Sequence, residues 1–497
     1  MSRLFRTKSI DELVAASEEP HKRLKKTLGP LSLTALGIGA VIGSGIFTLT
    51  GTAAAGAVTK IGSVLDMPLG ILLIQGAQAG SEMGRPGAGP AITLSFVLVA
   101  IACAFAGLCY AELSSMVPVA GSAYTYAYAV LGELFAWIIG WDLILEYAVS
   151  NMSVAVGFSA YMEDLFENLF GFHLPSQLAY PPFPAPGQPA GWFNVPALVI
   201  TMAVTWILVR GVKESAEVNT AMVLIKIAAI LIFCFGAAKA IDTANWKPFA
   251  PHGFAGILSG ASLVFFTYIG FDSVSTAAEE CRRPQRDLPI GLFATLVVCT
   301  VLYASVSLVL TGVVHFDQLN NDSPVANALK GLGMNRIRLV VTAGALMGML
   351  SSLLVFQYGQ ARIWFAMSRD RLMPAMFSAV HDRFKTPHVS TWIAGFVVGI
   401  PAGIWDIATF AELSNIGTLF AFAIVSASVI VLRKKQPDRP RTFRVPFVPL
   451  FPMISILCCL VLMLGLPLLS WLRFFSWLLI GLVIYFVYSQ KQVSRAA

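Results

Sequence analysis

Glycine is concentrated in one short stretch of the chain, GIGAVIGSGIF at residues 37–47, which lies inside the apolar run 31–56. Glycine is a poor helix former and allows backbone dihedrals that other residues avoid, so we expect a helix to be interrupted here. An interruption exposes amide N–H groups at the start of one half-helix, which suit a carboxylate, and carbonyls at the end of the other, which suit an ammonium group. The stretch therefore predicts a site for a zwitterion, built from Val41, Ile42, Gly43, Ser44 and Gly45.

A second apolar run contains a similar interruption, in LVFFTYIGFDSV at residues 263–274, where Gly270 and Asp272 stand in the middle of the run. Neither residue is favoured in the middle of an unbroken membrane helix. We expect Asp272 to cap the half-helix that follows the break. The carbonyls that we expect to bind the remaining ammonium protons are those of Phe266, Thr267 and Ile269.

Close packing of small residues is the alternative explanation of the first glycine stretch. Gly39 and Gly43 have the GxxxG spacing that is common where membrane helices pack together. The two interruptions, however, fall five apolar runs apart. Interrupted helices at matching positions in two halves of a chain are typical of transporters built as an inverted repeat, with the binding site at the breaks. The pair of interruptions therefore favours a binding site over packing.

Three charged residues lie inside other apolar runs. Lys226, in AMVLIKIAAILIF, would cost about 2.5–3.5 kcal/mol near the bilayer centre, so we expect it to have a function. Its ammonium group could bond carbonyls released at the first break, or its long side chain could reach the membrane interface. Asp142 and Glu146 are four residues apart and share one helix face. We expect Asp142 to pair with a basic residue, and Glu146 to hold a proton, shape selectivity or bond to a neighbouring helix.

The elements that position these residues are long apolar helices. Of the 497 residues, 57% are hydrophobic and only 12% are charged, whereas a soluble protein carries about twice that charged fraction. The long apolar runs lack the two-residue alternation of barrel strands, and each approaches the ~20 helical residues that cross a bilayer. We predict an all-α membrane protein with 12 transmembrane helices, at residues 31–56, 89–112, 132–160, 193–211, 218–240, 256–279, 288–314, 336–366, 389–405, 409–432, 449–468 and 472–490.

The positions of Lys and Arg predict the orientation of these helices. With the N-terminus inside, 25 of the 34 Lys and Arg fall on the cytoplasmic side, which agrees with the positive-inside rule. Both termini are therefore expected in the cytoplasm, and the protein in the cell (inner) membrane. The predicted units are an N-terminal tail at 1–29, a first repeat at 30–242 with an outer insertion at 57–88, a second repeat at 243–433, and helices 11–12 with the C-terminal tail at 434–497. Part of the insertion is weakly apolar but too short to span, which suggests a surface or re-entrant helix.

Several other functions find little support in the chain. The seven cysteines and six histidines have no metal-ligand spacing, so we expect no metal site and no cofactor. A membrane enzyme would need a Gly-x-Ser-x-Gly elbow, a His-Glu-x-x-His pair or a similar set of groups, and neither motif is found. A channel would show continuous pore-lining charge or a carbonyl filter, and neither is visible. The net charge of +7 is mostly a topology signal and calls for no nucleic acid partner.

Several blocks together resemble amino acid permeases of the amino acid, polyamine and organocation superfamily. These blocks are GIGAVIGSGIF, CYAELSSMVPVAGSAYTYAY, GWDLILEY, FFTYIGFDSVSTAAEE and GQARIWFAMSRDRLMP. The resemblance runs from about residue 28 to the end of the chain and is strongest to bacterial members of the cationic amino acid transporter branch. It implies a LeuT-like fold, a 5+5 inverted repeat with discontinuous helices 1 and 6, and uptake of amino acids, usually with protons. The insertion at 57–88 is longer than the first outer loop usual in the family.

The resemblance also implies roles for single residues. Lys226 matches the lysine that stands where sodium-driven relatives hold a sodium ion, so it is the expected proton-coupling residue and no sodium site is expected. Glu146 and Phe356 match positions that line or adjoin the substrate pocket, and a phenyl ring at 356 disfavours a long cationic side chain. Phe266 is the expected gate, with Tyr268 as the neighbouring aromatic residue. The segment AELSSMVPVAGSAYTYAY resembles an amphipathic connector that helps to close the inner route.

The predicted function is a proton-coupled symporter that imports L-amino acids, small or medium neutral ones, by alternating access. The alternative is an exchanger that also takes cationic amino acids, and the remote alternatives are a channel or a membrane enzyme. The predicted partners are an L-amino acid, the proton, the lipid bilayer and a small single-span membrane protein.

Overall fold

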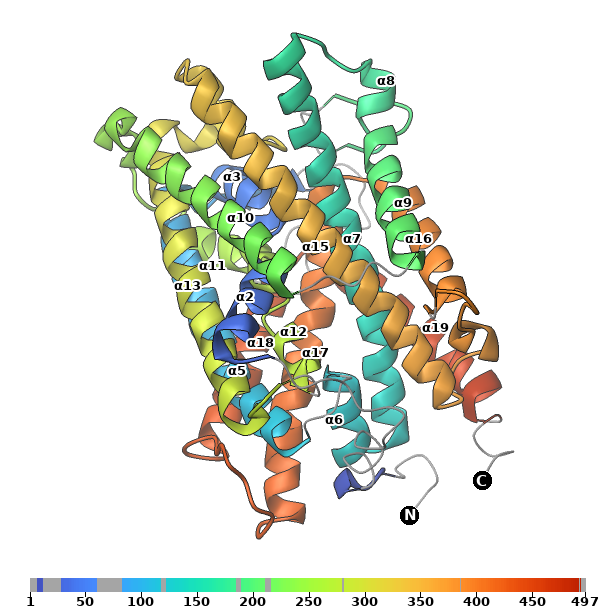
Figure 1. Ribbon diagram of the computed structural model, residues 1–497. Helices are drawn as coiled ribbons and strands as arrows, with labels where there is room; N and C mark the ends of the chain where they lie inside the picture. Colours follow the sequence, from blue (N-terminus) through green and yellow to red (C-terminus); the bar gives the residue numbers. More distant parts are fainter. Residues whose placement is uncertain are drawn as a thin grey trace.

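The computed structural model describes residues 7–11, 28–59, 83–117, 122–184, 189–210, 216–278, 281–384, 386–490 and 492 (Figure 1). Within these residues each predicted apolar run contains helix, which confirms the all-α fold class. The α-helices are α2 (Pro30–Val41), α3 (Thr50–Ala55), α5 (Ile92–Met116), α6 (Ser122–Val130), α7 (Glu133–Phe170), α8 (Ser176–Ala179), α9 (Val195–Val209), α10 (Ala216–Ala237), α11 (Gly253–Val264), α12 (Ser273–Thr276), α13 (Pro284–Val313), α14 (Pro324–Gly331), α15 (Asn335–Arg369), α16 (His388–Ala402), α17 (Ile407–Lys435), α18 (Leu450–Leu464) and α19 (Leu468–Ile484).

Short turns of other helix types extend or connect these helices. The 3₁₀ turns are Gly89–Ala91, Ala238–Ala240, Thr243–Trp246, Phe265–Tyr268, Phe316–Gln318 and Ala375–Ser378. The π-helical turns are Gly45–Leu49 and Tyr485–Ser489. Short 3₁₀ and π turns commonly mark places where a helix changes course. Two of them, Gly45–Leu49 and Phe265–Tyr268, lie at the two interruptions predicted from the sequence.

Eight helical segments of the described chain are long and apolar enough to cross a membrane. They are Gly89–Met116, Glu133–Phe170, Thr220–Ala240, Gly253–Ser275, Pro284–Val313, Asn335–Arg369, Ile407–Lys435 and Leu468–Ser489. A ninth candidate is the pair Pro30–Val41 and Gly45–Ala55, which is bent by 45°. Three further apolar helices, α9, α16 and α18, are shorter. Side chains on the outer faces, such as Phe235 on α10 and Leu479 on α19, are apolar and exposed, as is expected of helices that face lipid.

A small hairpin joins the two ends of the insertion at 57–88. Strand β1 (Gly56–Thr59) pairs antiparallel with β2 (Met83–Pro86), with Gly56 opposite Pro86 and Thr59 opposite Met83. The weakly apolar part of the insertion, for which we predicted a surface or re-entrant helix, lies outside the described residues.

Helix α7 is the scaffold of the bundle, and it packs against α6, α9, α15, α16, α17 and α19. It starts after Gly132 and ends at Gly171, which adopts the left-handed conformation common at helix C-termini. In Figure 1, α15 crosses in front of α7 along much of the bundle. Glycines allow the close approach: a Cβ atom at Gly140 would lie 2.8 Å from Met367 Sδ of α15.

The interrupted first helix is enclosed by three others. Helix α2 packs against α13, α10 and α15. Each of these three helices carries a polar side chain that reaches the end of α2 at the break, namely Tyr303, Lys226 and Ser352. The fold therefore surrounds the first break with donors from distant parts of the chain.

Helix α19 is fastened to α7 by tryptophans. The rings of Trp141 and Trp477 are stacked with centroids 4.4 Å apart. The indole N–H of Trp141 donates to the Trp477 carbonyl at 2.9 Å, and that of Trp477 donates to the Trp141 carbonyl at 3.1 Å. Trp137 donates in the same way to the carbonyl of Gly481 at 2.9 Å. These paired contacts join the last long helix to the scaffold.

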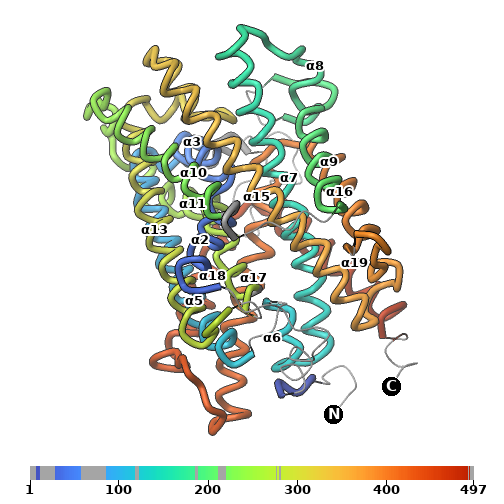
Figure 2. The backbone as a smooth tube through the Cα atoms, in the orientation of Figure 1, coloured from blue at the N-terminus to red at the C-terminus, as the bar shows by residue number. Residues whose placement is uncertain are grey.

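Residues 7–11 lie at the same end of the bundle as α6, which we call the terminal end (Figure 2). The ammonium group of Lys8 lies 2.9 Å from Asp370 Oδ1, just after α15, and Tyr124 of α6 donates to Oδ2 of the same carboxylate at 2.7 Å. Asp11 pairs with Arg439 at 2.6 Å. The segment thus ties α6, α15 and the connection after α17 together.

Candidate functional site

The first helix is interrupted where the sequence predicts. Helix α2 ends at Val41, and Ile42 leaves the helical conformation with ψ at 89°. The chain then resumes as the π-helical turn Gly45–Leu49 and continues into α3, bent by 45°. This confirms the predicted interruption. The glycines are closely packed as well, since a Cβ atom at Gly43 would lie 3.0 Å from the Ser352 hydroxyl, so packing and the break occur together.

The sixth run is interrupted as well. After α11 and the 3₁₀ turn Phe265–Tyr268, Ile269 is extended with ψ at 132°. Gly270 follows with φ at +108°, a conformation that strongly favours glycine. A Cβ atom at Gly270 would also lie 3.0 Å from the Cβ of Ala40 on α2. Glycine is therefore needed at this position for its dihedral and for the close contact with the first break.

The two interruptions lie against each other. The hydroxyl of Tyr303, on α13, lies 3.1 Å from the carbonyl oxygen of Val41 and 2.9 Å from that of Thr267, so it can donate to either. A Cβ atom at Gly45 would lie only 2.8 Å from the methyl group of Thr267. The backbone groups predicted to form one site are thus brought together from residues more than 200 positions apart.

Several of the predicted carbonyls are already bonded within the protein. Phe266 accepts a hydrogen bond from the Ile269 amide at 3.2 Å, and Thr267 accepts from Tyr303. The Gly43 amide, predicted to face a carboxylate, donates to the Val41 carbonyl at 3.0 Å. Each carbonyl oxygen has two lone pairs, so an ammonium group could share Val41 and Thr267 with Tyr303 rather than displace it.

Lys226 is fully buried and is bonded to the first break. Its ammonium nitrogen donates to the carbonyls of Gly39 at 2.7 Å and Ile42 at 2.9 Å. The hydroxyl of Ser352, on α15, lies 3.4 Å from each of the same two carbonyls. The predicted contact of Lys226 with the break is confirmed, and the alternative of a lysine that reaches the membrane interface is wrong. Its role in coupling stays a prediction.

Two hydroxyl groups beside the first break have no hydrogen-bond partner among the described residues. They belong to Ser44 and Thr48, and both side chains are fully buried. Both lie against Gly157 of α7, where a Cβ atom would be 2.7 Å from Ser44 Cβ. Buried hydroxyls are normally bonded, so these two are free to bond a ligand. Thr48 was not selected from the sequence, because a threonine next to the glycine stretch looks like ordinary packing.

Two aromatic residues selected from the sequence are buried near the breaks. Phe266 lies in the 3₁₀ turn of the sixth run, and the neighbouring Tyr268 bonds instead to the Phe96 carbonyl. Phe356, on α15, stands one helical turn after Ser352, and its ring meets the edge of Tyr147 with centroids 5.8 Å apart. Phe356 therefore shares a helix face with a residue that reaches the first break.

Two expectations for acidic residues are wrong. Asp142 is fully buried, and neither carboxylate oxygen has a partner among the described residues, whereas we predicted an ion pair. Asp272 occupies the position before α12 and makes no standard capping hydrogen bond; its carboxylate bonds instead to backbone amides at the break itself, including that of Ser273. It is also close to Glu146 and to Ser122 of α6. Glu146 is buried too, and its Oε2 has no partner among the described residues.

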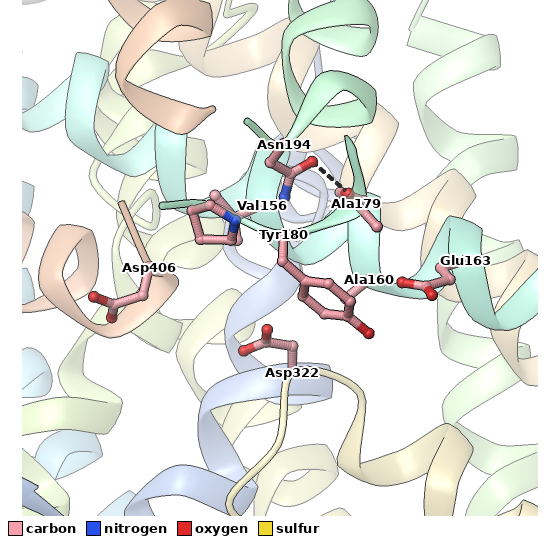
Figure 3. Close-up of a pocket in the computed structure, with 10 residues that line it drawn as sticks. Val156, Ala160, Glu163, Ala179, Tyr180, Asn194, Asp322 and Asp406 are labelled. Carbon is pink, nitrogen blue, oxygen red and sulfur yellow. Dashed lines mark hydrogen bonds between the residues drawn. The ribbon is translucent and has the colours of Figure 1, made fainter. Parts of the chain in front are cut away.

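Residues that the sequence did not single out line a pocket beside α8 (Figure 3), and α8 lies at the opposite end of the bundle from α6 (Figure 1). The lining residues are Val156, Ser159, Ala160, Glu163, Ala179, Tyr180, Pro181, Asn194, Asp322 and Asp406. In Figure 3 the ring of Tyr180 stands between Glu163 and Asp322. Burial, with the charge of Glu163 as the next cause, raises the pKa of Tyr180 to about 12. Three carboxylates, those of Glu163, Asp322 and Asp406, therefore line the pocket, which begins beside Gly157, and Gly157 faces Ser44.

Comparison with known proteins gives a consistent picture. Residues 28–492 match the family model described as "Amino acid permease". The chain is 48% identical, over 98% of both chains, to "Branched-chain amino acid permease BcaP" of Bacillus subtilis (strain 168), and 45% identical, over 99% of both chains, to "Methylthioribose transporter" of the same organism. It is also 35% identical to "Cationic amino acid transporter 4, vacuolar" of Arabidopsis thaliana, over 88% of this chain and 68% of that one.

Proposed function

The chain belongs to the amino acid permease family and is a multi-pass membrane protein, and from this premise we propose that it is a proton-coupled symporter. It imports small or medium neutral L-amino acids by alternating access. The coupling ion is the proton and no cofactor takes part.

We propose a LeuT-like architecture of 12 transmembrane helices with both termini in the cytoplasm. The eight clear spans, the bent pair and the three shorter apolar helices supply this number. The first five and the second five form the inverted repeat, and α18 and α19 follow it. The breaks then fall in the first helix of each repeat, where such transporters hold their substrate.

The meeting of the two breaks is the observation that carries the proposal. Tyr303 lies within hydrogen-bond distance of both interrupted helices, and Lys226 holds the end of the first. Backbone groups freed at membrane depth need partners, and a zwitterion supplies both kinds. The substrate carboxylate binds at the amides of Ser44 and Gly45, and its ammonium group binds at the carbonyls of Val41 and Thr267.

The environment of the breaks favours a neutral side chain. Val154 of α7 lies 3.7 Å from the Cβ position of Gly43, and Phe356 lies one turn beyond Ser352 on α15. Aliphatic and aromatic walls suit an aliphatic side chain and leave a cationic one without a partner. The branched-chain substrate named for the 48% identical relative agrees with this preference.

Different residues would close the route on the two sides of the substrate. Phe266, in the 3₁₀ turn of the sixth run, is the residue of the outer gate that faces the substrate. The small pocket around Tyr180 lies on the same side, beside Gly157, which faces Ser44, and so marks where the outer route would open (Figure 3). On the other side, α6 and residues 7–11 cover the terminal end.

Two other functions have a specific observation in their favour. Methylthioribose is the substrate named for the 45% identical relative, and it has no carboxylate and no ammonium group. Amino acid exchange, including cationic substrates, is favoured by the cationic amino acid transporter to which the chain is 35% identical. The binding screen and the transport assay below separate these functions from the proposed one.

The first experiment measures substrate binding. Purified protein in detergent is heated with each of the twenty amino acids or with methylthioribose, because a ligand that prefers the folded state raises its stability by mass action. Leucine, isoleucine or valine should raise the melting temperature, and arginine should not. A shift with methylthioribose alone would replace the amino acid with that compound as the substrate.

The second experiment measures coupling. Liposomes that contain only this protein should accumulate the labelled amino acid under an inward proton gradient. If they swap internal for external substrate and the gradient has no effect, the protein is an exchanger. The Lys226→Ala variant should retain substrate-driven exchange and lose gradient-driven accumulation.

A further inference from the structure

Asp142 has an unusual environment for a carboxylate. It lies on α7, is fully buried, and neither oxygen has a hydrogen-bond partner among the described residues. Its Oδ1 atom is 2.7 Å from the Cβ position of Gly417 on α17. Any side chain larger than hydrogen at 417 would displace the carboxylate. Gly417 therefore leaves room for Asp142 at the α7–α17 contact, but it supplies no side-chain hydrogen-bond donor there. An unpaired carboxylate is very costly there, whereas a neutral carboxylic acid is tolerated.

Asp142 is the end of a column of three acidic residues. Glu146 lies one helical turn further along α7, and its Oε2 also lacks a partner among the described residues. Glu146 interacts with Thr418, the neighbour of Gly417, and with Asp272 at the break of the sixth run. The column therefore runs from the substrate site, at Asp272, through Glu146 to Asp142 on the side nearer α6 and the terminal end.

The groups that face the column from other helices are neutral in the described part of the chain. Tyr110 of α5 and Tyr126 of α6 interact with Asp272, and Tyr147 of α7 interacts with Asp272 and Glu146. No described Lys, Arg or His interacts with Asp142. The facing group from α17 is Thr418. From α19 it is Trp477, whose ring is stacked on Trp141. No ion pair in the described chain therefore holds Asp142 in its charged form.

An independent observation comes from α15. Gln360 is fully buried, and neither its amide oxygen nor its amide nitrogen has a partner among the described residues. It stands between Gly359, which contacts Tyr147, and Met367, which contacts Gly140. Gln360 is therefore at the level of Asp142 and Glu146 on α7. An unpartnered buried amide on the neighbouring helix at this level is a further polar group that a bound water would satisfy.

We propose that Asp142, Glu146 and Asp272 form a proton relay, and that Asp142 is its exit site at the terminal end. The proposal rests on the proposed proton coupling. In each transfer an O–H bond breaks on one carboxylic acid and a new one forms on the next carboxylate, through bridging water. The last proton passes from Asp142 to water at the terminal end. Each donor becomes a carboxylate and can accept the next proton, so charge is conserved at every step.

The test uses the Asp142→Asn variant in liposomes with an internal pH indicator. Asparagine has the same shape and carries no exchangeable acid proton, so accumulation driven by the proton gradient should fall at least ~10-fold. Proton entry per substrate should fall with it. Substrate counterflow at constant pH should persist and lose the pH dependence that it has in the wild type. The Asp142→Glu variant, which keeps an acid, should recover part of the accumulation.

The matched control is Ser150→Ala, because Ser150 bonds to Ser414 at 2.6 Å and so joins the same two helices without a carboxylate. It should leave coupling intact. A second readout does not depend on transport: the infrared band of buried carboxylic acids in the wild type should lose intensity in Asp142→Asn.

Three results would overturn the relay. The first is Asp142→Asn protein that accumulates substrate as the wild type does. The second is loss of counterflow together with accumulation, which would assign Asp142 to packing. The third is an infrared carboxylic acid band that is unchanged in the variant. If the wild type itself shows no gradient effect, the proposed proton coupling fails; failure confined to the variant concerns the relay alone.

Discussion

The two interrupted helices satisfy their freed backbone groups in different ways. At the first break the carbonyls of Gly39, Val41 and Ile42 accept hydrogen bonds from side chains of other helices, Lys226 and Tyr303. At the sixth-run break several turns are closed by the chain itself, although side chains of other helices also contribute. The Ile269 amide donates to Phe266, and the Phe271 amide donates to Tyr268 at 3.4 Å. Tyr303 lies 2.9 Å from the Thr267 carbonyl. Asn415 of α17 donates to the carbonyls of Ser262 and Leu263.

This difference has a mechanical consequence. The conformation of the first break depends on the charge and position of groups on α10, α13 and α15, so a proton gained or lost at Lys226 changes it directly. The turns of the second break are closed in part by its own amides, so we expect it to depend less on those helices and to act as a hinge. On the proposed coupling role of Lys226, we expect the first break to be the part that senses the proton and the second to be the part that moves. Four substitutions test this contrast.

The largest effect is expected from Lys226→Ala. Two hydrogen bonds from a charged donor are lost, each worth about 1.5–3 kcal/mol, and two buried carbonyls are left without that donor. Gradient-driven uptake should fall ~100-fold or more, as measured with labelled substrate in liposomes. Lys226→Arg, which keeps the charge but changes its shape, is the control. Normal accumulation by Lys226→Ala would remove the lysine from the coupling mechanism.

The next largest effect is expected from Gly270→Ala. Alanine at φ +108° is strained by about 1–2 kcal/mol, and its methyl group would press on Ala40. The melting temperature should fall by several degrees, and transport should slow. Gly253→Ala is the matched control, because Gly253 also has a positive φ, +58°, but nothing lies within 4 Å of its Cβ position. Equal losses in the two variants would show that strain alone, and not contact between the breaks, matters at Gly270.

A smaller effect is expected from Tyr303→Phe. The hydroxyl near both breaks is removed while the ring remains, which costs about 1 kcal/mol and a several-fold loss of substrate affinity. Substrate-induced thermal shifts measure the affinity. Tyr161→Phe loses the bond, at 2.7 Å, from its hydroxyl to the Phe47 carbonyl and serves as the control. If both variants bind substrate equally well, the link through Tyr303 has no part in the site.

The smallest effect is expected from Ser273→Ala. The Gly270 carbonyl accepts from both the Ser273 hydroxyl and the Ser273 amide, and only the hydroxyl is lost. Stability and uptake should change by less than ~1 kcal/mol and about twofold. Large losses of uptake in this variant would mean that the sixth-run break depends on side chains as much as the first does, and the contrast between the two breaks would disappear.

The sequence predicted both interruptions because glycine and a buried charge are unfavourable in a membrane helix, and that penalty is local. The run boundaries followed from hydropathy for the same reason. The contact of Lys226 with the first break was also correct, since few other partners exist at that depth.

Other parts of the site depend on how distant helices meet. Tyr303 and Ser352 look like ordinary packing residues in their own runs, and only the placement of α13 and α15 beside α2 gives them a role. Asp142 was wrongly paired with a basic residue, because spacing along α7 does not reveal that Gly417 faces it. The pocket around Tyr180 joins residues of three separate connections and left no local signal.

Because Trp141 and Trp477 stack and exchange two hydrogen bonds, we expect α19 to move together with α7. A fluorescent dye attached at the exposed Leu479 would then stay in a fixed position relative to α7 and serve as a reference point. Paired with a second dye at the exposed Leu31, near the start of α2, it would report the travel of the first half-helix as a change in energy transfer.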